Sequence, residues 1–209
     1  KEVRTGSIKD ESLPTVYGKG FIGTNYRSYY ISGDGKKVNT KEYEVWRGMI
    51  RRCYSKEKEK FPTYINCEVS DNFCSYEYFY EWCNKQVGFD RKFDLDKDLL
   101  IKGNKTYHED LCVFVPPEIN SLIVKNDRVR GKYPIGVHFC KTKKKFVAQI
   151  NRNKVKQDYL GQFDSVEDAF LAYKVAKEDF IKEVAEKWRG VVDNRVYNAL
   201  MNYEVEITD

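Results

Sequence analysis

The sequence contains no apolar run near the ~20 residues that a membrane-spanning helix needs. It also shows no signal peptide, so we expect a soluble, cytoplasmic protein with no membrane partner. Its six cysteines never form a CxxC pair, the spacing typical of zinc ribbons. We therefore expect reduced, mostly buried thiols and no zinc. The glycines of residues 17–35 lack the strand–GxGxxG–helix context of a phosphate loop, so they indicate turns, and no small-molecule cofactor is expected.

The composition allows a sizeable core and leaves a nucleic-acid partner open. The chain has 209 residues, enough for two modest domains or one large one. Hydrophobic residues make up 41% and aromatic residues 15%, which suffices for a core and leaves rings for surfaces. The net charge of +5 is mild, so the placement of the basic residues says more than their number.

The segment 93–126 has the pattern of a strand, a turn-rich loop, a second strand and a helix. In FDLDKDLL, apolar residues and aspartates alternate with the period of a half-buried strand. IKGNKTYHED supplies Gly and Asn for a turn, and LCVFV is a short β-branched and aromatic run. Pro116 and Pro117 then predict the start of a helix, because proline is tolerated at a first helical position. Such an arrangement can bring a carboxylate from the first strand beside a side chain on the helix, which is how a small protein builds an open site for a divalent cation.

This segment resembles the HNH endonucleases, whose core is a ββα-metal motif. The resemblance implies that Asp96 and Asn120 bind a divalent cation, Mg²⁺ or Mn²⁺, and that Asn104 braces the loop. Water would complete the shell of oxygen ligands, as Mg²⁺ prefers. The cation would stabilise charge on the phosphate and on the leaving oxygen.

The sequence departs from the family at the general base. Lys97 stands where the family has histidine, and a lysine near its ordinary pKa is protonated at pH 7. The nearby aspartates favour that charged form. His108, the one histidine of the segment, could reach inward from the loop as a replacement, although a surface turn is the commoner place for a histidine and is the favoured interpretation.

The residues before this segment extend the resemblance. Residues 1–40 are weakly patterned, with a loose hairpin expected near YRSYYIS. From Thr40 a helix is expected with Trp46 on its buried face, and Arg47, Arg51 and Arg52 on other faces would hold a DNA backbone. A second helix is expected over residues 75–86. Together with LDKD, GNK and VPPEIN, this order is similar to HNH-type proteins of phages, so Lys97 could be a trait of that subgroup.

Residues 134–188 carry a different pattern. Three strand-like runs, YPIGVHFC, KKFVAQINRN and QDYLGQFD, are joined by short polar turns. Ser165 and Asp168 then form a capping box, and the helix that follows has an apolar stripe suited to covering a sheet. The segment resembles the Apetala-type (ethylene-response-factor) DNA-binding domain, which implies a three-stranded sheet in the major groove with the helix packed behind it.

Alternation divides the predicted sheet into two sides. Phe146, Ala148 and Ile150 are expected to face the helix. The side chains expected on the open, DNA-facing side are His138, Cys140, Val147, Gln149, Asn151, Gln157 and Tyr159. Gln and Asn can bond adenine edges, whereas the arginines usual in the family are largely missing here.

Basic residues cluster in the two predicted hairpins, and a solvated lysine-rich turn is the plainer alternative. The cluster residues are Lys141, Lys143, Lys144 and Lys145 in the first hairpin and Arg152, Lys154 and Lys156 in the second. We place both tips at the same end of the sheet, beside the phosphates, where binding would weaken steeply with salt.

We therefore predict an α+β protein in five parts. They are an irregular segment (1–40), an HNH-like ββα-metal module (41–126), a linker (127–133), an Apetala-like domain with a three-stranded antiparallel sheet on one long helix (134–188), and a C-terminal helix and tail (189–209). The first hypothesis is a metal-dependent, phage-encoded endonuclease acting on double-stranded DNA in a bacterial host cell. In it, Lys97 serves as an electrophile or an unusual base. The second is an HNH scaffold that no longer cuts and acts as a DNA-binding regulator or a phage counter-defence protein.

Overall fold

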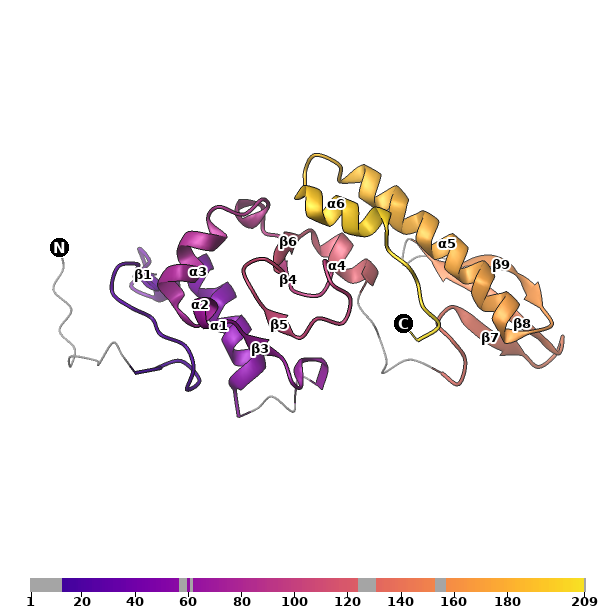
Figure 1. The fold of residues 1–209 in the computed structure, drawn as a ribbon, viewed down its shortest axis with the longest axis horizontal. Coiled ribbons are helices and arrows are strands. Elements are labelled where there is room, and N and C mark those ends of the chain that lie inside the picture. Colours follow the sequence, from indigo (N-terminus) through magenta and orange to yellow (C-terminus); the bar gives the residue numbers. More distant parts are fainter. Residues whose placement is uncertain (1–12, 57–59, 61, 124–130, 153–156, 209) are drawn as a thin grey trace. The chain divides into compact units, whose positions relative to one another are not determined.

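The protein contains both α-helices and β-strands (Figure 1). Its computed structural model describes residues 13–56, 60, 62–123, 131–152 and 157–208. The chain divides into two compact units, Lys1–Phe114 and Val115–Asp209. Two predicted DNA contacts, Lys154 and Lys156, lie outside the described residues, as does most of the predicted linker.

The first unit is built from short elements. Its helices are α1 (Lys41–Tyr54), α2 (Asp71–Cys74), α3 (Tyr76–Cys83) and the 3-10 turns η2 (Pro62–Tyr64) and η3 (Phe89–Arg91). Its strands are β1 (Tyr29–Ile31), β2 (Lys37–Asn39), β3 (Glu68–Val69), β4 (Asp94–Asp96), β5 (Thr106–Tyr107) and β6 (Val113–Val115), which ends just past the boundary.

Helix α1 begins where the sequence predicts. The Thr40 side chain accepts a hydrogen bond from the Tyr43 backbone N–H, which satisfies one of the first-turn donors. Trp46, Met49 and Ile50 are fully buried at helical spacing. The indole N–H of Trp46 donates to the Phe73 carbonyl at 2.8 Å and so joins α1 to α2. An aromatic core therefore holds these short helices together.

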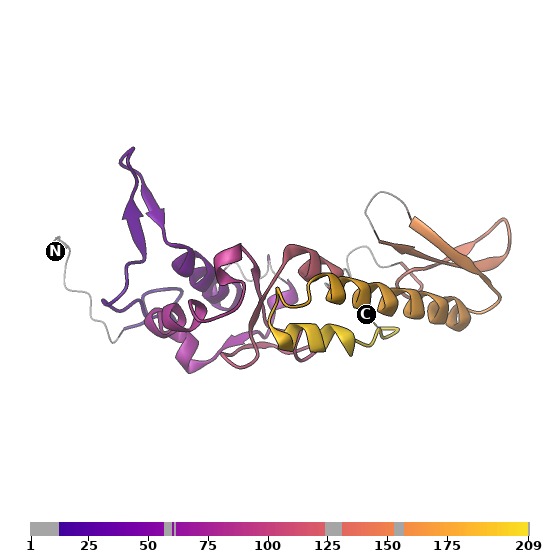
Figure 2. The ribbon, with the colours of Figure 1, turned by 90° about the horizontal axis from the view of Figure 1, so that it is seen from above.

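The described part of the first unit holds three small sheets, of which the last strand ends just past the unit boundary. β1 and β2 form the expected hairpin, which projects as a ribbon in Figure 2. β4 and β6 are neighbours, and α4 (Pro117–Ile123) follows β6 at the proline pair, so the predicted order of strand, loop, strand and helix is present. The parallel pair of β3 and β5 was not expected from the sequence.

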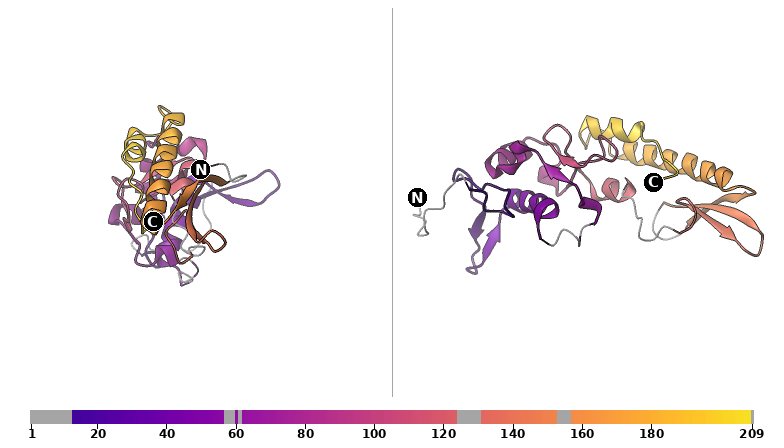
Figure 3. Two further views of the ribbon diagram at one scale, coloured as in Figure 1. Left: turned by 90° about the vertical axis from the view of Figure 1, so that its right-hand side faces the viewer. Right: turned by 60° about the horizontal axis from the view of Figure 1, so that its bottom comes forward.

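The second unit contains the predicted sheet on a helix. β7 (Val137–Cys140), β8 (Lys145–Asn151) and β9 (Gln157–Phe163) are antiparallel in that order. α5 (Val166–Lys187) lies along the sheet in a second layer (Figure 3), with the Ser165 hydroxyl accepting from the Asp168 N–H at 3.0 Å. α6 (Asn194–Met201) is the expected short helix near the C-terminus. This part of the predicted fold is confirmed.

A bulge bends β9 in the middle of the sheet. The register shifts between Ala148 and Gln149, which leaves Leu160 as the extra residue on β9. Gly161 has φ +143°, and an added Cβ would lie 3.0 Å from the Phe163 ring. Glycine in the LGQF run is therefore required by the bulge.

Helix α4, which the sequence grouped with the HNH-like module, belongs to the second unit and is bonded to α5. Lys187 and the Trp188 indole, both at the end of α5, donate to the Glu118 carboxylate of α4 at 2.7–2.8 Å. Lys177 of α5 donates to the Leu122 carbonyl at 2.9 Å. These bonds fasten both ends of α4 to α5.

Candidate functional site

Asp96 is a buried carboxylate at the end of β4. It is 8% exposed, and its Oδ1 accepts hydrogen bonds from the backbone N–H groups of Asp98 and Leu99 at 2.9 and 2.7 Å. Burial and the charge of Asp98 raise the pKa of Asp96 despite these bonds. The side chain is therefore no ordinary surface carboxylate, and a nearby cation would favour its charged form.

Lys97 is buried beside Asp96 and fastened to the loop that follows. Its ammonium donates to Asp98 at 2.9 Å and to the Asn104 carbonyl at 3.0 Å. Burial alone would lower the pKa of Lys97, but the hydrogen bond and charge of Asp98 outweigh it, so the pKa is raised. Lys97 therefore stays protonated at neutral pH, which disfavours the general-base role and leaves the electrophilic one.

Asn104 ties the loop together through its side chain. Its amide N–H₂ donates to the carbonyls of Lys97 and Thr106 at 2.6 and 2.8 Å, and its amide oxygen accepts from the Thr106 N–H at 3.0 Å. These three bonds close the turn between β4 and β5. The geometry is that of a loop brace, the role that the resemblance implies.

A second cation, the half-buried Arg52, shares its aromatic surroundings with Lys97. The Arg52 guanidinium lies 5.2 Å from the Tyr64 ring centre and 5.6 Å from that of Tyr107, and its Nε donates to the Tyr107 hydroxyl at 3.2 Å. The Lys97 ammonium lies 5.9 and 6.0 Å from the same two rings. Arg52 is thus engaged with two tyrosine rings, unlike the cleft-lining Arg47 and Arg51, with which the sequence grouped it.

His108 is engaged with its own turn. Its Nδ1 accepts from the Asp110 N–H at 3.2 Å and lies 3.7 Å from the carboxylates of Glu109 and Asp110. The His108 carbonyl closes the turn by accepting from the N–H groups of Leu111 and Cys112. The ring is 38% exposed, as expected for the surface-turn alternative.

Of the two predicted metal ligands, Asp96 and Asn120, only Asp96 lies in the first unit. Asn120 belongs to α4 in the second unit, whereas Asp96 belongs to the first. Within the described ranges, no group of three or more His, Cys, Asp or Glu side chains could hold a metal ion. Mg²⁺ is commonly bound by one or two carboxylates together with water and substrate phosphates. Asp96 fits a cation that binds together with a phosphate.

The sheet of the second unit has one covered side and one open side. Arg152 continues the alternation of Ala148 and Ile150, and its guanidinium lies 3.4 Å from Glu183 and 5.7 Å from the Phe180 ring, both on α5. The Phe146–Ala148–Ile150 side is therefore the helix side, as predicted. The residues on the other side are His138, Cys140, Lys145, Val147, Gln149, Asn151, Gln157, Tyr159 and Gln162.

The open side combines hydrogen-bonding groups with an exposed aromatic ring. Tyr159 is 62% exposed and stands opposite Gln149 across the bulge. His138, Asn151 and Gln157 are also exposed, whereas Val147 is buried between its cross-strand partners. A large exposed ring among polar side chains is typical of a binding surface.

Two expectations about the basic residues are corrected. Consecutive antiparallel strands turn at opposite ends of a sheet, so the β7–β8 and β8–β9 hairpins cannot share one end. Arg152 lies on the helix side, where Glu183 and Asp158 pair with it, and we remove it from the predicted DNA contacts. Lys145 pairs with Asp164. Lys141, Lys143 and Lys144 are exposed at the first hairpin tip.

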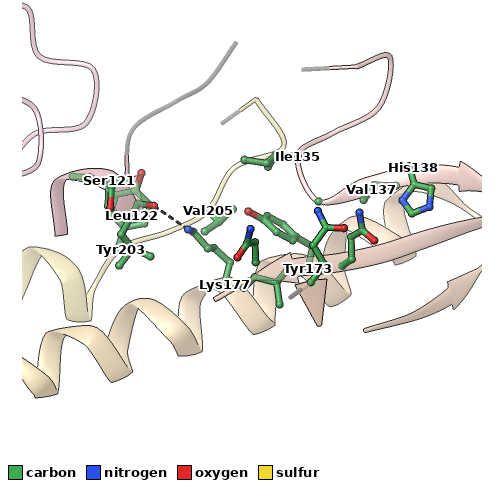
Figure 4. A pocket seen from close by; sticks show the side chains of 15 residues that line it. Ser121, Leu122, Ile135, Val137, His138, Tyr173, Lys177, Tyr203 and Val205 are labelled. Carbon is green, nitrogen blue, oxygen red and sulfur yellow. Dashed lines mark hydrogen bonds between the residues drawn. The ribbon is translucent and has the colours of Figure 1, made fainter. Parts of the chain in front are cut away.

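A cavity of about 790 Å³ in the second unit lies beside the open side (Figure 4). His138, Gln149, Asn151 and Gln157, all predicted DNA contacts, contribute to its lining. Lys177 reaches across it from α5 to the Leu122 carbonyl, with Tyr173 beside it. Burial lowers the pKa of Lys177 to about 8. Sequence reasoning missed this lysine because helical spacing alone does not show that a cation is buried.

Comparison of the chain with protein-family models, curated proteins and solved structures gives no match. The six cysteines are free, and Cys53, Cys67, Cys83 and Cys112 are buried, as expected. None of the helices in the described part of the chain is long and apolar enough to cross a membrane.

Proposed function

We propose that this protein binds double-stranded DNA through the open side of the β7–β8–β9 sheet. The observation that carries the proposal is the division of the sheet: α5 covers one side, and the other presents amide, imidazole and phenol groups to solvent. A sheet of this width can enter the major groove, where amide side chains can bond adenine edges. In this proposal Gln149 and Asn151 would make such bonds.

The first hairpin would contact the DNA backbone. Lys141, Lys143 and Lys144 are exposed where β7 turns into β8. Each phosphate that they neutralise would release counterions, so the logarithm of the binding constant should fall with log salt by about 0.9 per contact. Phosphate contacts fix the position of a protein on the duplex, and the sheet side chains would supply any base preference.

A salt titration of binding to a labelled duplex tests this proposal. In fluorescence anisotropy, Lys143→Ala with Lys144→Ala should weaken binding and lower the salt slope by about 2. Lys85→Ala with Lys182→Ala removes the same charge elsewhere and serves as the matched control. Binding that is absent in the unmodified protein, or equal slopes in the two double variants, would contradict the proposal.

Metal-dependent cleavage of DNA is a second candidate, and the buried Asp96 favours it. A buried carboxylate with a raised pKa is a recurrent feature of functional sites. Asp96 would hold Mg²⁺ or Mn²⁺ together with water and the substrate phosphate, and the cation would stabilise negative charge on the reacting phosphate. Asn104 would keep the loop closed around Asp96, and Lys97 would present a positive charge to the phosphate.

The alternative is an HNH-like scaffold that binds DNA without cutting it, as a regulator or a phage counter-defence protein. The raised pKa of Lys97 favours this alternative, because a protonated lysine cannot accept a proton from water. The position of His108 in its own turn favours it as well.

Incubation with supercoiled plasmid in Mg²⁺ or Mn²⁺ separates these two candidates. Nicking that is lost in Asp96→Ala and in EDTA supports the nuclease. An inert protein that gains nicking with Lys97→His supports the scaffold. Nicking that persists in Asp96→Ala would contradict the assigned site.

A further inference from the structure

A basic cleft of about 750 Å³ lies in the first unit between helix α1 and the turn at residues 16–20. Arg47 and Arg51, one helical turn apart, form the α1 wall together with Tyr54. Lys56 adds a third positive charge at the end of the helix, and the described lining includes no acidic side chain. The Lys19 ammonium lies 5.6 Å from the Tyr54 ring centre, on the turn side.

The opposite wall of the cleft is fixed by packing against α1. The Gly20 N–H donates to the Val16 carbonyl at 2.8 Å, and a Cβ added to Gly20 would lie 2.7 Å from the Trp46 ring. Tyr17 and Gly18, which line the cleft, both have positive φ, +51° and +72°. A tyrosine in the left-handed region is uncommon and persists only where its surroundings impose it. The wall is therefore formed before any ligand binds.

A buried hydroxyl in this cleft lacks a partner. Ser55 lines the cleft and is 5% exposed, yet among the described residues nothing bonds its Oγ. Leaving a buried donor unsatisfied is costly, so such a group points to a ligand that accepts from it. A ligand oxygen that accepts from Ser55 would satisfy this hydroxyl, and the two guanidinium groups would neutralise the ligand's charge.

We infer that this cleft binds a phosphate group, supplied in the full chain by a backbone phosphate of DNA. Guanidinium forks match the geometry of phosphate oxygens, and a hydroxyl donor completes the set. The source of the phosphate rests on the proposed DNA-binding function, whereas the phosphate chemistry rests on the cleft alone. The contact would lie outside the β7–β8–β9 sheet and would contribute to affinity without reading sequence.

Two titrations of the full chain test this inference. Inorganic phosphate should bind saturably in calorimetry, and Arg47→Ala with Arg51→Ala should weaken that binding at least about tenfold. The same double variant should lower the salt slope of DNA binding by about 2. Lys85→Ala with Arg91→Ala removes equal charge from elsewhere in the first unit and should leave phosphate binding unchanged.

Ser55→Ala separates the hydroxyl from the charges. It should weaken phosphate binding about three- to tenfold and leave the salt slope unchanged, because no charge is removed. Phosphate binding lost in the arginine variant with DNA affinity equal to the control would identify free phosphate as the ligand. Phosphate that fails to bind saturably, or that binds the arginine variant equally well, would overturn the cleft even if the sheet binds DNA.

Discussion

The two units of this protein place their charged groups in opposite ways. In the first unit Asp96 and Lys97 are buried and Arg52 is half-buried. The β4–β5 loop holds Lys97, and two tyrosine rings lie beside Lys97 and Arg52. In the second unit the charges of the sheet are mainly at its surface, and a long helix and strands form a regular core. Interior charges need specific partners, whereas surface charges are available to a ligand. The proposed DNA binding therefore uses surface groups of the second unit, and the proposed cleavage uses interior groups of the first unit.

The largest expected effect is loss of the second unit by Gly136→Val. Gly136 has φ +76°, and an added Cβ would lie 2.0 Å from the Tyr173 ring of α5. Backbone strain and the clash together should cost more than about 3 kcal/mol. In chemical denaturation the second unit should unfold at a lower denaturant concentration than in the unmodified protein, and DNA binding should be lost.

Gly131→Ala is the control for that change, because nothing lies within 4 Å of a Cβ at Gly131. It should leave both stability and DNA binding unchanged. Full DNA affinity in a Gly136→Val protein whose second unit has unfolded would assign DNA binding to the first unit instead.

Lys97→Met should destabilise the first unit by about 2 kcal/mol, because it removes the donor to the buried Asn104 carbonyl. The pKa of Lys97 is raised, so its stabilising effect is fully present below the unfolded value of 10.5 and is lost as the pH rises through the folded value. The stability difference should therefore be constant from pH 6 to 9 and shrink above about 10.5. Equal stability of the two proteins at pH 7 would contradict the assigned hydrogen bonds.

Lys177→Met should stabilise the second unit, whereas Lys97→Met should destabilise the first. Burial lowers the pKa of Lys177 to about 8, so the folded protein is penalised for the charged form at lower pH. After subtracting the lost bond to Leu122, the variant should be more stable on the order of 1–2 kcal/mol at pH 6. The gain should shrink as the pH rises above about 8. A destabilised variant at pH 6 would show that the ammonium bond outweighs burial.

Asp96→Asn should give the smallest change, a stabilisation of at most about 1 kcal/mol at pH 7. The raised pKa of Asp96 means that its charge costs stability above the unfolded value of 3.8, and the gain should vanish as the pH falls through the folded pKa towards that value. Thermal scans in Mg²⁺ and in EDTA sharpen the test. Mg²⁺ should stabilise the unmodified protein and not the variant if Asp96 binds the cation.

Long periodic elements could be predicted from the sequence, and the interior polar contacts could not. The stripe of α5 and the alternation of β8 each repeat often enough to fix which side is buried. Arg52 and Arg152 were expected to contact DNA, yet each has a partner distant in the sequence. The parallel pair of β3 and β5 has two residues on each strand, too few for a period to show.

Removing side chains from the open side of the sheet tests the central claim most directly. Anisotropy titrations should compare two variants with the unmodified protein. The first variant carries Gln149→Ala, Asn151→Ala and Tyr159→Ala together. The second carries Leu171→Ala and Val175→Ala together, which truncates exposed residues of α5. With melting temperatures unchanged, the first variant should bind a DNA duplex more than about tenfold more weakly, since each base contact contributes about 1–3 kcal/mol. The second should bind like the unmodified protein. Equal affinities of all three proteins for DNA would contradict a sheet that binds the major groove.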